Sequence, residues 1–431
     1  MKANKSAVAS PKELNKLVLP PGSVAPKYGS YCISGIPSSI MNQFGVKPVG
    51  VPLPDGALGE TKGIESVVLL ILDGFGMSAF RRQQSEGFVK SMASKGIVRP
   101  ITTVFPSTTA AALTTFATGL TPQEHGLHEW FLYIKDLDAV IATLPFSFAS
   151  DPGRETLRGR MKPRALFTGE SIFGKLQKAD VQVESFVSRA LAGTSYTSLV
   201  HRTSKKVAYS SSSDMVALLR RRLESAHGPS FFYVYWSYID SIEHKYGPAT
   251  DESELEAAAI SFVIQKGLIE RLGKAAAKRT LLIVSADHGQ VPVNPEKTIY
   301  LNRYRSAVKG LRRLGSGRPI PATGSARDVF LHVQPDQVDR VRKILAKALA
   351  GRASVLRVDD AVKAGLFGLN KPSRKFKERV GSLLILPHGN GTVWYKDTPD
   401  YELDLRGHHG GMSREEMTVP LAVGRVSDLQ R

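Results

Sequence analysis

The chain has 431 residues, of which 42% are hydrophobic and 8% are aromatic. This length and composition suffice for one large α/β unit with insertions or for two domains, and they argue against a disordered or fibrous protein. The 58 Lys and Arg residues exceed the 39 Asp and Glu residues and give a formal charge of +19. That charge favours anionic partners such as phosphate esters, nucleotides, nucleic acid or acidic lipid.

The single cysteine, Cys32, excludes an internal disulfide and a metal site built from thiolates. Any metal must therefore be held by Asp, His and hydroxyl groups. The basic start of the chain is not followed by an apolar run of signal-peptide length, and no run reaches transmembrane length. We therefore expect no membrane span and, by default, a cytoplasmic location.

The first strong structural signal follows a stretch of about 60 residues rich in Pro, Gly and Ser, which we interpret as an extension packed on the core. SVVLLILDGFG (66–76) is a continuous apolar run, as expected of a strand buried on both faces of a parallel sheet. Asp73 closes that run. A buried carboxylate costs several kcal/mol unless it is paired or bound to metal, so Asp73 is either a ligand or the cap of the next helix.

Next, the sequence predicts a helix over 78–96, a strand from Ile97, and a second helix from about Thr109. Three hydroxyls, those of Ser107, Thr108 and Thr109, precede the second helix, whose N-terminus favours an anion or a nascent alkoxide. Coordination to a divalent cation would make one of them an effective nucleophile. Local context leaves all three open, since Ser107 could cap the helix.

Two further apolar runs, 230–240 and 279–289, flank an amphipathic helix. Alternating strands and helices predict a doubly wound, mostly parallel sheet flanked by helices, hence the α/β class. Asp240 and His244 are spaced i, i+4 and could share one metal, or form a plain surface ion pair. The adjacent pair Asp287 and His288 ends the last strand, as Asp73 ends the first.

Between 301 and 400 the strand candidates are shorter, with a helix at 335–349, which predicts a small α+β insertion or cap. His408 and His409 follow, before two glycines and a capping box that starts at Ser413. Either histidine is available by chemistry. We therefore divide the chain into an N-terminal extension (1–60), a catalytic domain (61–300 and 401–431) and the insertion (301–400).

In this order the motifs resemble the type I phosphodiesterases and nucleotide pyrophosphatases of the alkaline phosphatase superfamily. LILDGFG is similar to the first metal-binding strand of that family, and VFPSTTAAALTTFATGLTPQEHG to its nucleophile segment. YIDSIEHKYGP, SADHG and HHGGMSREEMTVPL resemble its remaining metal-binding elements. The resemblance implies an alkaline-phosphatase-like fold, and it selects Thr109 as the nucleophile and His409 over His408.

The resemblance also implies two divalent metal ions. One would be held by Asp240, His244 and His409. The other would be held by Asp73, Thr109, Asp287 and His288. Zinc is the usual metal of the family, and Asp and His ligands also suit manganese. The implied reaction has two steps, because Thr109 attacks phosphorus and the resulting phospho-threonine is then hydrolysed.

One residue departs from the family pattern. Nucleotide pyrophosphatases typically place an Asn shortly after the P-x-x-H-G element to donate to a phosphoryl oxygen, and here Trp130 occupies that position. Trp130 offers an indole N–H, a stacking face or simple packing, and is the predicted substrate-binding residue. Preference for diesters over monoesters is therefore open.

Three functions are compatible with these residues. The leading hypothesis is a bimetallic phosphodiesterase or nucleotide pyrophosphatase acting on a small phosphate ester or nucleotide, with no obligatory nucleic acid. A phosphomonoesterase or phosphonate hydrolase would use the same site. A basic protein that binds anions or nucleic acid, with a vestigial metal site, is the alternative of another class. The intact set of ligand positions argues against decay. The sequence gives no signal of oligomeric state.

Overall fold

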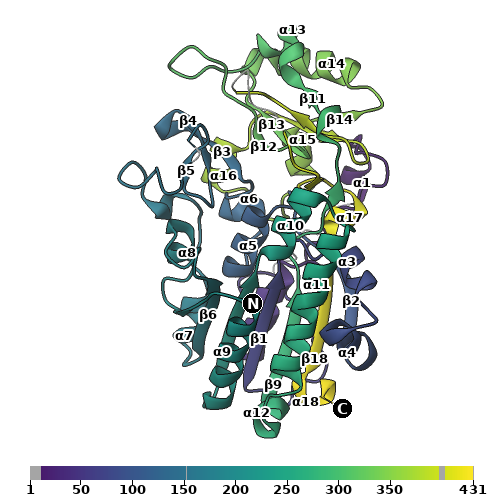
Figure 1. Cartoon of the computed structure of the whole chain (residues 1–431). Helices are drawn as coiled ribbons and strands as arrows, with labels where there is room; N and C mark the ends of the chain where they lie inside the picture. The colour runs from purple at the N-terminus through teal and green to yellow at the C-terminus, as the bar shows by residue number, and fades with distance from the viewer. Residues whose placement is uncertain (1–10, 152, 398–402, 431) are drawn as a thin grey trace.

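A computed structural model of the chain describes residues 11–151, 153–397 and 403–430, and Figure 1 shows its architecture. The main sheet has seven strands in the order β2-β18-β9-β1-β8-β6-β7. Only β18 in this sheet runs antiparallel to its neighbours. The strands are β2 (Ile97–Thr102), β18 (Thr418–Arg425), β9 (Thr280–Ser285), β1 (Ser66–Leu72), β8 (Ser230–Trp236), β6 (Gln182–Ser188) and β7 (Lys205–Tyr209).

The central strands β1, β8 and β9 are buried at every residue, which explains their continuous apolar sequences. Two groups of mutually contacting helices flank the sheet. One group contains α4 (Gly87–Lys95), α9 (Ser212–Ser225) and α11 (Asp251–Ile264), and the other contains α2 (Gly35–Gln43), α5 (Thr109–Thr118) and α7 (Ile172–Gln177). The predicted α/β class with a mostly parallel, doubly wound sheet is confirmed.

The single helix predicted over 78–96 is wrong, because the chain forms α3 (Met77–Arg82) and α4 with a break between them. Gly87 starts α4 with a φ of +55°, a conformation that favours glycine. A Cβ on Gly87 would lie 2.8 Å from the backbone carbonyl of Ser261 in α11. The break therefore lets α4 begin in close contact with α11.

A second sheet, also of seven strands, lies beside the main sheet in the order β14-β15-β13-β12-β3-β4-β5. All its pairings are antiparallel. Its strands are β14 (Ala353–Arg357), β15 (Leu383–Pro387), β13 (Asp328–Leu331), β12 (Thr323–Ser325), β3 (Phe131–Ile134), β4 (Ala139–Ala142) and β5 (Ser147–Phe148), and α14 (Val338–Ala348) packs on β14. The second sheet thus combines strands of the predicted insertion (β12, β13, β14 and β15) with three strands of the predicted catalytic domain (β3, β4 and β5). The domain bounds themselves stay a prediction.

The described part of the N-terminal segment packs against both sheets. Cys32 is buried and forms a β-bridge with Thr102 at the end of β2. The hydroxyl of Tyr28 donates to the Leu366 carbonyl at 3.2 Å and accepts from the Phe105 N–H at 3.1 Å. No helix in the described residues is long and apolar enough to cross a membrane.

The remaining elements are short. The helices are α1 (Pro11–Leu14), α6 (Pro122–His125), α8 (Ser195–Val200), α10 (Tyr238–Tyr246), α12 (Lys274–Arg279), α13 (Arg305–Val308), α15 (Val358–Lys363), α16 (Arg374–Arg379), α17 (Arg414–Met417) and α18 (Val426–Leu429). The strands are β10 (Val291–Pro292), β11 (Ile299–Tyr300), β16 (Val393–Trp394) and β17 (Gly407–His408).

The topology brings the segments that contain the predicted site residues to one edge of the main sheet. In register, Leu72 at the end of β1 pairs with Trp236 at the end of β8, and Ile71 pairs with Ser285 at the end of β9. Because β18 is antiparallel, its first residue, Thr418, pairs with Thr102 at the end of β2. The segments that follow β1, β2, β8 and β9, and the segment that precedes β18, therefore meet at the carboxyl edge, where open α/β sheets bind ligands.

Candidate metal centre and active site

Two carboxylates from neighbouring strands lie at the base of the site. Asp73 is 2% exposed, and its Oδ2 accepts a hydrogen bond from the hydroxyl of Tyr235. Asp287 is fully buried, and its Oδ1 accepts from the N–H groups of Gly74 (3.1 Å) and His288 (3.0 Å). Among the described residues, Oδ1 of Asp73 and Oδ2 of Asp287 have no hydrogen-bond donor. Burial, and then repulsion from Asp287 and Asp240, raises the pKa of Asp73 well above its usual value.

His288 joins these carboxylates to the predicted nucleophile. Its Nε2 lies 3.5 Å from Oδ1 of Asp73, 3.5 Å from Oδ2 of Asp287 and 3.1 Å from the hydroxyl oxygen of Thr109. Thr109 is 6% exposed and is the first residue of α5. The unpaired N–H groups of this helix start, and its dipole, favour negative charge beside the Thr109 hydroxyl.

A second cluster contains Asp240, His244 and His409. Oδ1 of Asp240 lies 3.4 Å from Nε2 of His244 and 3.7 Å from Nε2 of His409. Asp240 comes close to the first cluster because Gly74 has no side chain. A Cβ on Gly74, whose φ is +75°, would lie 3.0 Å from the Cα of Asp240.

The three histidines are oriented in the same way. Nδ1 faces a backbone carbonyl in each ring: Gly289 at 3.2 Å for His288, Gly407 at 2.8 Å for His244, and Ser107 at 3.0 Å for His409. A carbonyl can only accept, so each Nδ1 carries the proton and each Nε2 turns a lone pair into the site. Burial, and then the neighbouring imidazoles, lowers the pKa of His409 well below its usual value, which keeps this ring neutral.

The donor set fits divalent cations. Two overlapping groups, Asp240–His244–His409 and Asp73–Asp240–His288, each offer ligand atoms within 4.8 Å of one another. Asp287 and Thr109 lie beside the second group, as the preceding distances show. Imidazole lone pairs and carboxylate oxygens at such distances repel one another unless a cation lies between them, and Asp and His ligands suit zinc or manganese.

A family model described as type I phosphodiesterase/nucleotide pyrophosphatase matches residues 67–412. The chain belongs to this family. Its members are phosphoester-cleaving enzymes, so the resemblance seen in the sequence motifs is confirmed.

Individual relatives of this phosphodiesterase-family chain are distant. It is 25% identical over 288 residues to venom phosphodiesterase CdcPDE of Crotalus durissus collilineatus, an alignment that covers 64% of the chain and 32% of that protein. The chain therefore spans about a third of the length of the curated relative it matches.

Solved structures show the same fold. Murine ectonucleotide pyrophosphatase/phosphodiesterase 5 has a TM-score of 0.60 and 18% identity, with 82% of this chain and 87% of that chain covered. The human protein of the same name has a TM-score of 0.60 and 16% identity, with 84% and 92% covered. An inactive threonine-to-alanine variant of the murine protein in complex with AMP has a TM-score of 0.59 and 17% identity, with 84% and 92% covered.

In this phosphodiesterase-family chain, two cavities meet at the predicted nucleophile. A cavity of about 460 Å³ is lined by Phe131, Trp394 and Asp404 from the side of the second sheet. A smaller cavity of about 180 Å³ extends toward β6 and α8. Both are lined by Thr109, Trp130, Asp240 and Ser241. Trp130 therefore lies at the junction, where its backbone is held by a 2.8 Å hydrogen bond from the Thr143 N–H to its carbonyl.

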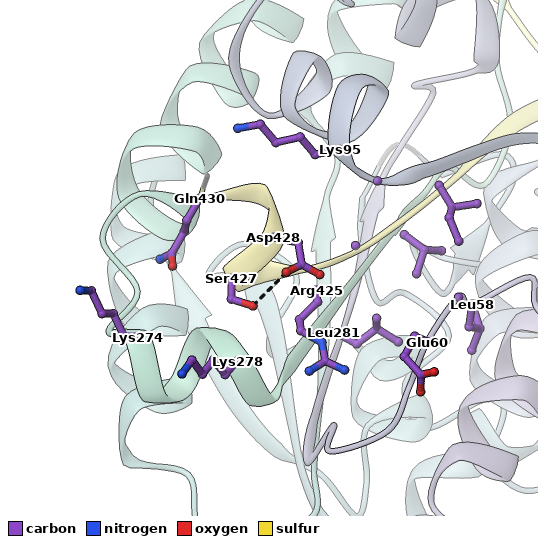
Figure 2. Close-up of a pocket in the computed structure, with 15 residues that line it drawn as sticks. Leu58, Glu60, Lys95, Lys274, Lys278, Leu281, Arg425, Ser427, Asp428 and Gln430 are labelled. Atoms are coloured by element: carbon purple, nitrogen blue, oxygen red, sulfur yellow. Dashed lines mark hydrogen bonds between the residues drawn. The ribbon is translucent and has the colours of Figure 1, made fainter.

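A larger cavity lies elsewhere. A cavity of about 760 Å³ at the opposite edge of the main sheet is lined by Lys95, Lys278, Arg425 and neighbouring residues (Figure 2). None of the predicted site residues lines it. No histidine lines this cavity. Among the described residues, the groups of Asp, Glu, Cys and His that could share a metal ion lie at the carboxyl edge.

Several residues that shape the site gave no signal in the sequence. Tyr235 holds Asp73, and Gln290 donates to Oδ1 of Asp240 at 2.6 Å. Ser107 does not cap α5, because its hydroxyl donates to the Gly411 carbonyl at 2.8 Å. Tyr235 lies within an apolar strand, and Gln290 directly follows the D-H-G element, so neither residue stands out from its neighbours in the sequence.

Arg327, a basic residue of the predicted insertion, is paired inside the protein. Arg327 is buried and forms two hydrogen bonds with the Glu416 carboxylate, at 2.9 and 2.8 Å. Glu416 also accepts from the N–H groups of Gly411 (2.9 Å) and Ser413 (3.1 Å). Burial would raise the pKa of Glu416, but Arg327 and these hydrogen bonds lower it overall. The guanidinium of Arg327 is therefore directed at Glu416.

Proposed function

We propose that this chain is a metal-dependent phosphodiesterase or nucleotide pyrophosphatase in which Thr109 attacks phosphorus. One observation carries the proposal. The unpartnered oxygens of Asp73 and Asp287 and the lone pair of His288 converge within 3.5 Å, directly beside the Thr109 hydroxyl. A cation between these groups would offset the repulsion among them.

Two divalent cations fit this proposal, and zinc or manganese suits the ligands. Asp240, His244 and His409 would hold one, and Asp73, Thr109, Asp287 and His288 would hold the other. When bound, such cations lower the pKa of a coordinated hydroxyl and neutralise charge on phosphoryl and leaving oxygens.

The reaction of the chain itself has two displacements. The Thr109 oxygen forms a bond to phosphorus as the bond from phosphorus to the leaving oxygen breaks, which gives phospho-Thr109 and a free alcohol or phosphate. Water then attacks the same phosphorus, restores the Thr109 hydroxyl and releases the phosphate product. The N–H groups at the start of α5 favour the negative charge that develops on the phosphoryl oxygens. A threonine-to-alanine change also accompanies inactivity in the murine relative.

Two cavities beside one nucleophile suit a phosphorus that carries two substituents. The larger, about 460 Å³, falls within the roughly 300–1,000 Å³ of ligand pockets and presents aromatic rings. Phe131 and Trp394 form a tilted pair there, with centroids 6.1 Å apart. The AMP bound by the murine relative supports a nucleotide substrate for this chain as well. Trp130, at the junction, would contact both arms of the substrate.

The smaller cavity has a different charge. Among the described residues that line it, Arg154 is the only Arg or Lys, whereas the larger cavity is lined by neither type. We therefore assign the uncharged, aromatic arm of the substrate to the larger cavity and an anionic arm to the smaller one.

The test is hydrolysis by the purified full chain of bis-p-nitrophenyl phosphate, p-nitrophenyl phosphate and ATP. Each substrate is assayed after chelation and after addition of zinc or manganese. We expect turnover of the diester and of ATP that is lost on chelation and restored by metal. A folded, metal-loaded chain that turns over none of these substrates contradicts the proposal. Faster turnover of p-nitrophenyl phosphate than of the diester favours the phosphomonoesterase alternative instead.

A further inference from the structure

The exposed side of α11 carries an apolar stripe. Leu255 is 69% exposed and Phe262 is 58% exposed, although α11 buries its other side through Ala257, Ile260 and Ile264. Few large hydrophobic side chains in the described residues are this exposed, and these two lie two helical turns apart on one helix. Single exposed apolar residues need no explanation, but a stripe on a helix points to a partner.

The stripe has the spacing of a coiled-coil seam. The exposed residues Glu252, Leu255, Ala259, Phe262 and Lys266 follow one another at intervals of three and four. This is the a/d pattern by which two helices pack along their length. Ala259, at the centre, is small and permits close approach of the two backbones. α11 lies in the helix layer that faces the viewer in Figure 1.

The charges at the two ends of the stripe are opposite. Glu252 lies in the first turn of α11, and Lys266 lies two residues after its end, in the π-helical turn (Gln265–Ile269) that continues the helix. If a second copy of the stripe packs antiparallel to the first, each Glu252 faces the Lys266 of the other copy. Leu255 then packs beside Phe262 of the other copy, and the two Ala259 residues meet at the two-fold axis. Antiparallel packing also sets the two helix dipoles in opposite directions.

From this self-complementarity we infer that α11 is the contact surface of a two-fold symmetric homodimer. An isologous interface must match itself when rotated by half a turn, and a stripe with opposite ends and a small centre meets that requirement. Lys266 already pairs with Glu270 at 2.9 Å, but this ammonium is 53% exposed and has further donors for a second carboxylate. A single helix seam is smaller than the interfaces of roughly 1,200–2,000 Å² that form stable dimers, so this dimer dissociates on dilution.

Sedimentation equilibrium of the full chain over a wide range of concentration tests the inference. We expect a reversible monomer–dimer equilibrium for the natural sequence and a monomer at all concentrations for Phe262→Glu. Val51→Glu, at another exposed hydrophobic residue away from α11, is the matched control and retains the dimer. A natural chain that stays monomeric, or a dimer that Phe262→Glu leaves intact, overturns the inference.

Charge exchange then tests the antiparallel orientation. Glu252→Lys alone and Lys266→Glu alone each place two like-charged pairs in the interface, and we expect the dissociation constant to rise by about tenfold. The double variant restores the opposite pairs and the original dissociation constant. Circular dichroism checks that every variant folds. Failure of the double variant to restore the dimer overturns the antiparallel packing.

A cysteine at the two-fold axis gives an independent readout. Cys32, the only cysteine of the chain, is fully buried, so Ala259→Cys introduces the sole exposed thiol. We expect Ala259→Cys to form a disulfide-linked dimer under mild oxidation, and Arg221→Cys, exposed on the adjacent α9, to remain monomeric on non-reducing gels. Equal cross-linking of the two variants contradicts the inference.

Discussion

The imidazole rings of His288 and His409 stack face to face, with centroids 3.6 Å apart and an angle of 14° between the ring planes. His288 follows β9 and His409 precedes the neighbouring strand β18, so the stack joins the two clusters of ligands. Two protonated rings at this separation would repel strongly, and each Nδ1 is directed at a carbonyl. The fold therefore holds the two rings parallel, with each Nδ1 directed at a backbone carbonyl and each Nε2 directed at the carboxylate cluster.

Thr109→Ala should abolish hydrolysis and retain metal, because the other ligand positions keep their geometry. Activity on bis-p-nitrophenyl phosphate and metal content of the same sample are the measurements. Thr108→Ala is the control, since the Thr108 hydroxyl has no partner in the described structure. Activity that survives in Thr109→Ala but not in Thr108→Ala would show that the nucleophile is one residue earlier than we propose.

His409→Ala should lower metal affinity by about tenfold or more and remove activity, because an imidazole lone pair is lost from the site. The measurement is a metal titration by calorimetry. His408→Ala is a demanding control, since His408 is also buried and lines the same cavity, yet its Nδ1 contacts only the backbone of its neighbour. Equal loss of metal from both variants would contradict the assignment of His409 alone.

Arg154→Ala should reduce kcat/KM for ATP by about fivefold to tenfold, or roughly 1 kcal/mol, because Arg154 is exposed and its attraction for an anionic arm is screened. Turnover of bis-p-nitrophenyl phosphate, which lacks an anionic arm, should stay within about twofold of the original. Arg160→Ala, exposed in the same loop and outside the cavity lining, controls for overall charge. The same fractional loss on both substrates would exclude a role for Arg154 in substrate selection.

Glu129→Gln should change the pH dependence of stability. Burial raises the pKa of Glu129 to about 7 in the folded chain, and the facing carboxyl of Asp328 also has a pKa well above its usual value. The unfolded chain ionises Glu129 near pH 4.3. Between about pH 4.5 and 7 the folded state thus binds more protons, so the free energy of unfolding falls as pH rises.

Gln cannot ionise, so the free energy of unfolding of the variant does not include the fall with pH that Glu129 causes in the natural chain. Its stability relative to the natural chain should therefore increase from pH 5 to pH 7.5, by up to a few kcal/mol at roughly 1.4 kcal/mol per pKa unit. Urea unfolding at the two pH values, in chelator, measures it. If the variant and the natural chain differ in stability by the same amount at both pH values, Glu129 does not retain its proton in the folded chain as we propose.

Glu416→Gln should destabilise the chain by about 3–5 kcal/mol, because it leaves the buried Arg327 guanidinium without its carboxylate. Glu378→Gln is the matched control. Its partner Arg374 is 90% exposed, so its loss should change stability by less than about 1 kcal/mol. Thermal and urea unfolding compare the two. Equal losses of stability in the two variants would show that the buried pair of Arg327 and Glu416 does not stabilise the segment after His409.

Much of the fold was predictable because the strongest signals in the sequence are local. The runs that became β1, β8 and β9 are mostly apolar and buried throughout, and the Asp and His residues that follow them fall on one edge once the strands are parallel. The strands β3, β4 and β5 are short and belong to an antiparallel sheet whose other strands lie some two hundred residues later in the sequence. Neither their partners nor their sheet has a local signature.

In the site, too, some features have a local signal in the sequence and others depend on contacts between distant segments. The family resemblance indicated His244, His288 and His409, but the orientation of their rings depends on the Gly407, Gly289 and Ser107 carbonyls, and every residue type possesses a backbone carbonyl. The break between α3 and α4 was missed because it depends on the contact of Gly87 with α11, a helix distant in the sequence. Long-range backbone contacts of this kind leave no pattern in the chain that makes them.

The position of β18 also sets an order of events during synthesis. This strand lies between β2 and β9, inside the main sheet, and His409 immediately precedes its helix-and-strand unit. A nascent chain that has not yet extended past about residue 425 lacks the strand that joins β2 to the sheet. If the metal site is the one proposed above, the segment 409–425 would complete both that site and the main sheet.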